Sequence, residues 1–210
     1  SKDTVYLLDG FVFVNDGDEL TIEAGTVIKG NPGTGENASA LIVARGGKIM
    51  AQGTEDEPIV FTAEDDDVSD PSDLTYNDDS KWGGVIILGE GVLNSAAGET
   101  PIEGIPTSEP RGLYGGDNDA HNAGVFQYVS IRHGGSDIGE GNEINGLTLG
   151  GVGTGTTISH VEIYANKDDG IEFFGGAAMV TYAVVGASGD DSFDYDEGWH
   201  GGGSYWFTYQ

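Results

Sequence analysis

An internal repeat constrains this chain more than any other feature of its sequence. The segments FQYVSIRHGG, ISHVEIYANK and VTYAVVGASG, which begin at Phe126, Ile158 and Val180, align with one another. So do NGLTLGG, DGIEFFGG and DSFDYDEG, which begin at Asn145, Asp169 and Asp191. Between the last two units both segments are offset by 22 residues. A period of this length, made of short apolar segments, is typical of a β-solenoid, in which each repeat forms one coil stacked on the next.

The spacing between the first two units locates an insertion. Their first segments are 32 residues apart and their second segments 24, so eight extra residues fall in one turn, within 134–142. Stacked coils tolerate extra residues in turns because the strands stay in register. Inward-facing positions are then expected to form three apolar columns: Phe126, Ile158 and Val180; Leu147, Ile171 and Phe193; Leu149, Phe173 and Tyr195.

The remaining sequence extends this pattern toward the start of the chain. Short apolar runs at 41–43, 59–61 and 85–88 are bounded by Gly, Asn and Asp, and helical periodicity is almost absent. We therefore predict an all-β chain, a single solenoid domain over 1–210 with about six rungs of roughly 22 residues. Residues 1–30 are assigned to an N-terminal strand or cap region, and 65–81, which holds seven Asp, and 100–122 to loop insertions.

The charge of the chain excludes two classes of partner. Eight basic residues against 36 acidic ones give a net charge of −28 and a pI near 4.1. Binding to nucleic acid or to an anionic membrane surface requires clustered Lys and Arg, which are missing here. No stretch approaches the roughly 20 apolar residues of a membrane-spanning helix. Cysteine is absent from the sequence, so disulfides and thiol chemistry are excluded.

Acidic residues recur in register within the repeat. The alignment stacks Asp168 on Asp190, Asp169 on Asp191 and Glu172 on Asp194. Adjacent strands lie about 4.8 Å apart, and two unit charges at that distance repel by roughly 3.5 kcal/mol at an effective dielectric constant of about 20. Lys167 is the only nearby cation in the chain. A bound cation must neutralise this stack, or the carboxylates must turn into solvent.

Calcium is the cation that best fits such ligands. Ca²⁺ takes six to eight oxygens from carboxylates and carbonyls in irregular geometry, whereas the lack of Cys and the scattered His disfavour transition metals. The alternative is a solvated acidic face, as in a salt-adapted protein. The candidate ligands are the stacked acids, their neighbour in the last repeat, and the two acids of a D-x-D loop: Asp168, Asp169, Glu172, Asp190, Asp191, Asp194, Asp196, Asp117 and Asp119.

Five longer stretches carry a resemblance to a known family. They are LTIEAGTVIKG from Leu20, ALIVARGGKIMAQGTEDEPIVFTAE from Ala40, WGGVIILG from Trp82, NGLTLGGVGTGTTISHVEIYANKDDGIEFFGG from Asn145 and DDSFDYDEGW from Asp190. Together they resemble secreted right-handed parallel β-helix proteins of environmental bacteria of marine or Bacteroidetes type. The resemblance implies a right-handed parallel β-helix, an extracellular location, Ca²⁺ binding and a structural or adhesive role, and it implies no catalytic residues.

The sequence favours a secreted, calcium-stabilised structural protein of a fibre or surface layer. One alternative is a calcium-dependent polysaccharide lyase, for which Arg132, His133 and Lys167 are candidate bases, or a hydrolase using Asp168, Asp169, Asp190, Asp191 and His200. A chain of this charge repels anionic polysaccharides, which argues against both. Another alternative is a glycan-binding module that stacks sugars on Trp82, Trp199, Tyr205 and Trp206.

Both ends of the chain are apolar and strand-like, at 5–14 and 203–210. An uncovered solenoid end can pair with a second copy, and a head-to-tail contact of this kind generates a filament. We therefore expect head-to-tail self-association. The competing explanation is that the natural chain continues past Gln210 and covers its own end.

Overall fold

Parallel strands from successive coils form a six-stranded sheet, which we call sheet I. The computed structural model describes residues 1–139 and 142–210. All neighbouring strands of sheet I pair in parallel. In spatial order they are β2 (Phe11–Val14), β5 (Ala40–Val43), β8 (Val85–Leu88), β12 (Leu147–Gly150), β14 (Ile171–Phe174) and β16 (Phe193–Asp196).

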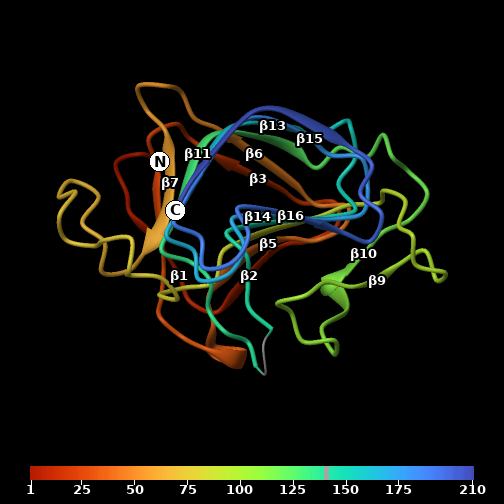
Figure 1. The fold of residues 1–210 in the computed structure, drawn as a ribbon, viewed down its shortest axis with the longest axis horizontal. Helices are drawn as coiled ribbons and strands as arrows, with labels where there is room; N and C mark the ends of the chain where they lie inside the picture. Colours follow the sequence, from red (N-terminus) through yellow and green to blue (C-terminus); the bar gives the residue numbers. More distant parts are fainter. Residues whose placement is uncertain (140–141) are drawn as a thin grey trace.

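Sheet II has nine strands and completes each coil. Its later strands are long and have two limbs: the first limb of β11 pairs with β6, and its second limb pairs with β7. Viewed as in Figure 1, the strands of successive coils superpose, so that β11, β13 and β15 follow one path. The strands are β1 (Tyr6–Leu8), β3 (Glu19–Ile22), β4 (Val27–Gly30), β6 (Lys48–Gln52), β7 (Ile59–Ala63), β11 (Gly124–Arg132), β13 (Thr157–Tyr164), β15 (Met179–Gly186) and β17 (Gly202–Tyr209).

This arrangement is a right-handed parallel β-helix, as expected, and the six strands of sheet I correspond to the six predicted rungs. The strand register confirms the repeat alignment. Phe126 lies opposite Ile158, which lies opposite Val180. Residues 1–30 contribute β1 to β4, which pair with the following coil in both sheets. Residues 140–141 of the predicted insertion at 134–142 lie outside the described residues.

The third apolar column differs from the prediction at its last member. Leu149, Phe173 and Tyr195 are in register, and the first two are buried. Tyr195 is 68% exposed because β16 is the outermost strand of sheet I among the residues described. The interior of the solenoid is therefore only partly covered at this end.

Each long strand of sheet II bends at an aromatic residue with positive φ. The bends are at Tyr128, His160, Tyr182 and Tyr205, with φ between 49° and 60°. Their rings stack face to face along the outside of the solenoid, with centroids 4.2, 4.5 and 4.6 Å apart. We call this row the corner stack. Left-handed backbone is unfavourable for side chains other than Gly, so ring stacking offsets part of that cost.

The two large loops differ in character. Residues 65–81 contain no strand and form turns in which Asp side chains bind Ser and Thr. The other insertion, 100–122, folds back over sheet I with the short antiparallel strands β9 (Thr100–Pro101) and β10 (Leu113–Tyr114) and a 3-10 turn, η2 (Pro110–Gly112). A second 3-10 turn, η1, spans Gly35–Asn37. Among the residues described, no helix is long and apolar enough to cross a membrane.

The insertion at 100–122 creates a second core on the outer face of sheet I. Ile102, Ile105 and Tyr114 are each no more than 2% exposed and belong to the cluster that contains Ile42 and Ile86 of sheet I. Sheet I is therefore covered on both faces from β2 to β14. This explains why strands such as β8 are apolar at every position rather than at alternate ones.

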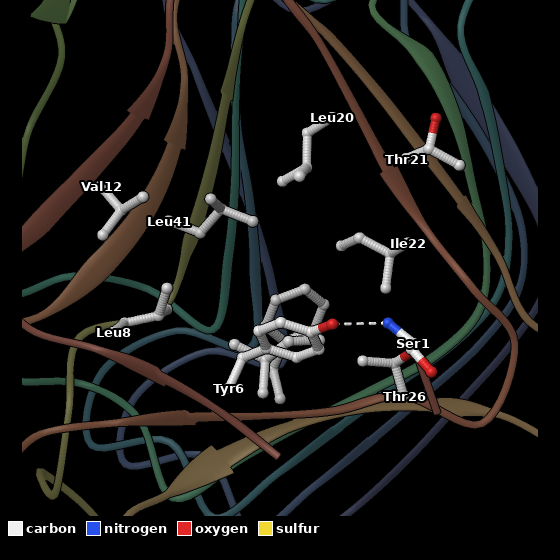
Figure 2. Close-up of a pocket in the computed structure, with 11 residues that line it drawn as sticks. Ser1, Tyr6, Leu8, Val12, Leu20, Thr21, Ile22, Thr26 and Leu41 are labelled. Atoms are coloured by element: carbon white, nitrogen blue, oxygen red, sulfur yellow. Dashed lines mark hydrogen bonds between the residues drawn. The ribbon is translucent and has the colours of Figure 1, made fainter. Parts of the chain in front are cut away.

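The first coil leaves an open apolar cavity of about 250 Å³ at its end of the solenoid. Figure 2 shows Leu8, Leu20 and Leu41 around it, and the terminal ammonium of Ser1 donating a hydrogen bond of 2.6 Å to the Tyr6 hydroxyl. The neighbouring side chains of Val5, Tyr6 and Leu7 are 42–59% exposed. Apolar side chains thus reach solvent at this end.

Candidate metal centre

Two successive corners of the solenoid bring five carboxylates together. Asp168 and Asp169 precede β14, which carries Glu172, while Asp190 precedes β16, which carries Asp194. Glu172 lies opposite Asp194 in the strand register, as predicted. The N–H of Gly170 donates to the Asp191 carbonyl at 2.9 Å, which ties the two corners together.

These carboxylates converge in two overlapping groups. Oxygen atoms of Asp168, Asp169 and Asp190 all lie within 4.8 Å of one another, and so do those of Asp169, Glu172 and Asp194. We call Asp168, Asp169 and Asp190 the outer group, and Asp169, Glu172 and Asp194 the inner group. Asp169 belongs to both. Within the described chain, none of the five carboxylates forms an ion pair with a basic side chain. The two groups therefore concentrate negative charge without compensation from the protein.

Burial makes this charge costly. Asp169 is 8% exposed and Glu172 is 6% exposed. Burial raises the pKa of Glu172 to about 9, assisted by the charges of Asp169 and Glu103. Burial also raises the pKa of Asp169 to about 7, although the Asp191 N–H bonded to it acts in the opposite direction. Without a cation, the inner group therefore holds protons at neutral pH, which a divalent ion would displace.

Asn145 adds a neutral oxygen beside the inner group. Its Nδ2 donates to Oε2 of Glu172, and its side chain is 1% exposed. Its Oδ1 accepts no hydrogen bond from any described residue. A buried acceptor without a donor is unfavourable, and an amide oxygen is a ligand that Ca²⁺ accepts. The residues present thus fit a calcium ion bound by three carboxylates and one amide.

The outer group is a weaker candidate for an ion site than the inner group. Burial raises the pKa of Asp168, as do the charges of Glu143 and Asp190, while Lys167 lowers it. Asp190 is exposed, and so is Lys167. Solvent can therefore screen much of the repulsion in this group, and the inner group is the better candidate for a tightly bound ion.

Four predicted ligands lie outside both groups. Asp191 is exposed and reaches the centre only through its backbone N–H, which donates to Oδ1 of Asp169 at 2.8 Å. Asp196 and Asp117 are also exposed. Asp119 accepts the Val92 N–H at 2.9 Å and contacts Nε2 of His200 at 3.0 Å. Neither acid of the D-x-D loop joins the stacked carboxylates.

The repeat alignment could have identified Asn145 as a candidate ligand, because it aligns Asn145 with Asp169 of the next coil. Strand register places Leu147 opposite Ile171, so Asn145 occupies in one coil the position of Asp169 in the next. Glu103 and Glu143 lack such a signal because they lie outside the repeating strands. Their charges nevertheless act on the centre, since they raise the pKa of Glu172 and of Asp168, respectively.

Two of the three residues considered for lyase chemistry, Arg132 and His133, have structural partners, whereas Lys167 is exposed. Nε of Arg132 donates to Ser130 at 2.8 Å, and its guanidinium lies 3.4 Å from Glu162. His133 is 3% exposed, and its Nδ1 lies 2.6 Å from the carbonyl oxygen of Asp78. Such contacts hold both side chains in the wall of the solenoid.

Three of the four aromatics considered for sugar stacking contribute to the core. Trp82 is fully buried and donates to the Arg132 carbonyl at 2.7 Å. Trp199 and Trp206 pack against the interior cluster. Tyr205 is 71% exposed, but one face of its ring stacks on Tyr182.

Comparison with known families agrees with this architecture. A family model described as a pectate-lyase-like β-helix domain matches residues 1–210. Neither a curated protein nor a solved structure matches the chain.

Proposed function

The chain belongs to the pectate-lyase-like β-helix family, and on that premise we propose that it is a secreted, calcium-stabilised structural β-helix of a fibre or surface layer. The observation that carries the proposal is the convergence of Asp169, Glu172 and Asp194 from two successive coils. Family membership alone does not assign an activity, because one fold can host many. The role must therefore be argued from the site.

The depth of the centre favours a structural role. Glu172 and Asp169 lie below the surface, where a polymeric substrate cannot reach their carboxylates. An ion bound there would join the corner before β14 to β16, and so hold adjacent coils together. Calcium sites of extracellular modules bind with dissociation constants of about 0.1–1 mM, which suits a protein bathed in millimolar Ca²⁺.

Metal analysis combined with thermal unfolding tests this proposal. We expect purified protein dialysed against CaCl₂ to retain at least one Ca²⁺ per chain. Calcium at about 100 times its dissociation constant contributes about 2.7 kcal/mol, which for a chain of this size raises Tm by about 5–10 °C. A matched NaCl solution controls for screening. If NaCl produces the same rise, the carboxylates are a solvated acidic face and calcium has no specific site.

Self-association is the second part of the proposal. The exposed Val5 and Leu7 lie at one end of the stack of coils, and β17, with Phe207 60% exposed, lies at the other. Contact between these unlike ends of two copies would not close on itself and would extend into a filament. Electron microscopy and light scattering in millimolar Ca²⁺ should show filaments that Leu7→Asp prevents. Monomers of the unsubstituted protein at high concentration would rule out this assembly.

A calcium-dependent polysaccharide lyase or hydrolase, or a glycan-binding module, is the alternative, and membership of the pectate-lyase-like family is compatible with it. The structural proposal predicts no unsaturated products or new reducing ends from a panel of uronic-acid polysaccharides with CaCl₂ present. Turnover that disappears in Asp169→Asn would establish the enzymatic alternative instead.

A further inference from the structure

A cavity of about 300 Å³ lies between the 100–122 insertion and the outer face of sheet I. We call it the insertion pocket. In Figure 1 the insertion is the green segment that carries β9 and β10, to the right of β14 and β16. Among the residues that line it are Ile102, Glu103, Tyr114, Phe174, Asp196 and Glu197. Its volume is at the lower end of the range for small-molecule sites, so it suits a small ligand.

The floor of the pocket is apolar and aromatic. Ile102 and Ile105 are each 2% exposed, and Tyr114 is 1% exposed. The rings of Tyr114 and Phe174 meet edge to face, with centroids 6.2 Å apart. Aromatic surfaces of this kind bind carbon skeletons and also attract cations to their faces.

Three carboxylates line the pocket, and no basic residue does. They belong to Glu103, Asp196 and Glu197. The surroundings of Glu103 disfavour its ionised form: burial and the charges of Asp168, Glu143 and Asp196 raise its pKa. The pocket therefore attracts a positively charged ligand and repels an anion such as a uronate.

Two polar groups in the pocket lack partners. The Tyr114 hydroxyl forms no hydrogen bond with any described residue although its side chain is nine-tenths buried or more. Burial and the charges of Glu197 and Asp196 raise its pKa, which places the hydroxyl among these acids. Oε2 of Glu197 is buried and also without a described partner. A ligand that brings N–H donors into the pocket would supply the Tyr114 hydroxyl with a partner and place positive charge beside the Glu197 carboxylate.

The spacing of these groups suits an organic cation better than a metal ion. Among the described residues, Glu103, Asp196 and Glu197 do not converge within 4.8 Å as the acids of the candidate metal centre do. We propose that the insertion pocket binds a primary ammonium group carried on a short aliphatic skeleton. The ammonium donates to Glu197 and to the Tyr114 oxygen, and the carbon chain lies against Phe174 and Ile102.

Titration with n-pentylammonium chloride tests this proposal, with 1-pentanol as the neutral probe of similar size. Both are titrated by NMR into protein saturated with CaCl₂, so that the candidate metal centre is not the site observed. We expect the amine to bind at least about tenfold more tightly than the alcohol, since hydrogen bonds to charged groups stabilise more than neutral ones. Intermolecular NOEs should connect the pentyl methylenes to the rings of Tyr114 and Phe174.

Glu197→Gln and Tyr114→Phe are each expected to weaken amine binding about tenfold. Glu55→Gln, which removes an exposed carboxylate outside the pocket, is the matched control and should leave the affinity unchanged. Equal weakening by Glu55→Gln would mean that the amine binds only to the acidic surface as a whole. Absence of the NOEs in the unsubstituted protein would also overturn the proposal, and that result does not depend on whether a variant folds.

Calcium competition separates this site from the metal centre. Amine binding should persist in Asp169→Asn and in calcium-free protein, so failure of the calcium proposal leaves it intact. If CaCl₂ instead displaces the amine in proportion to its concentration at constant ionic strength, the pocket is part of a cation cluster and the proposal is wrong.

Discussion

The same side chain has opposite electrostatic surroundings in different parts of this chain. In the 65–81 insertion, the hydroxyl and N–H of Ser69 lower the pKa of Asp67, and those of Ser72 lower the pKa of Asp70. In the candidate metal centre, burial raises the pKa of Asp169 to about 7. The difference is that exposed turns offer hydrogen-bond donors and water, whereas the corner before β14 offers few donors and several other acids. Acidic composition alone cannot distinguish these environments.

These pKa shifts predict an unusual dependence of stability on pH in calcium-free protein. An acid whose pKa is raised by folding contributes stability that is complete below its unfolded pKa and is lost as the pH rises through its folded pKa. For Asp169 and Glu172 this loss extends from about pH 4 to about pH 9. We expect Tm measured in chelator-treated buffer to fall steadily between pH 6 and pH 9.

The control for this experiment removes both titrating groups. Asp169→Asn with Glu172→Gln should flatten the profile between pH 6 and pH 9, a range in which ordinary carboxylates are already ionised. Saturating Ca²⁺ should flatten it in the unsubstituted protein as well. A Tm that rises with pH in the calcium-free protein would show that these acids are not destabilised when ionised.

The effect of Asp169→Asn on stability should have opposite signs in the absence and in the presence of calcium. Without the ion, at pH 8, the substitution removes a buried charge and should stabilise the protein by on the order of 2 kcal/mol. With the ion, it removes an oxygen shared by both groups and should abolish most of the calcium-dependent rise in Tm. Asp191→Asn, in the next coil and exposed, is the matched control and should change neither value. Destabilisation in both conditions would indicate a packing role for Asp169.

At the scale of strands and corners, the corner stack shows how the solenoid places side chains in backbone conformations that they normally avoid. Tyr182, with φ of 57°, lies between the rings of His160 and Tyr205. Each stacked pair contributes about 0.5–1.5 kcal/mol, while a left-handed residue other than Gly costs about 1–2 kcal/mol. The two terms are similar in size, so stacking decides whether a large residue is tolerated at this bend.

Two substitutions at Tyr182 separate stacking from backbone strain. Tyr182→Ala loses both ring contacts and keeps the strain, so we expect it to destabilise the protein by about 1–3 kcal/mol. Tyr182→Gly loses the same contacts but relieves the strain, and should be about 0.5–1 kcal/mol less destabilising, the reverse of the usual order in regular structure. Denaturant unfolding of both variants measures the difference. The ordinary order, with Gly worse than Ala, would contradict a strained bend.

The strands could be predicted from the sequence, but the segments that pack over the outer face of sheet I could not. Register followed from repetition, because identical spacing in successive units can be satisfied only by stacking. The second core over sheet I could not be foreseen, since Ile102, Ile105 and Tyr114 are isolated among Gly, Pro and Ser and follow no period. For the same reason, repetition placed Asp169 and Asp191 in one column, but could not show that only Asp169 is buried beneath a further coil.

At the scale of the whole molecule, each coil contacts mainly its two neighbours, so stability is distributed locally along the solenoid axis. The carboxylates of the candidate metal centre come from the coils of β14 and β16, and Asn145 adds its amide from the neighbouring coil of β12. Removing calcium should therefore loosen β14 to β17 without affecting the opposite end. Hydrogen exchange measured with and without chelator should show amides of β14–β17 exchanging at least about tenfold faster in its presence, and amides of β5 unchanged. Uniform acceleration along the chain would mean that the solenoid opens as one unit.

Successive repeats differ in length at their corners and not in their strands, and this limits how the chain can gain or lose residues. The eight residues added within 134–142 leave β11 paired with β13 and β12 paired with β14 in unbroken register. A duplication or deletion that spans one whole coil would leave the same pairings intact, whereas one that ends inside a strand would not. Relatives of this chain should therefore differ in length by whole coils and by corner loops, and not by fractions of a strand.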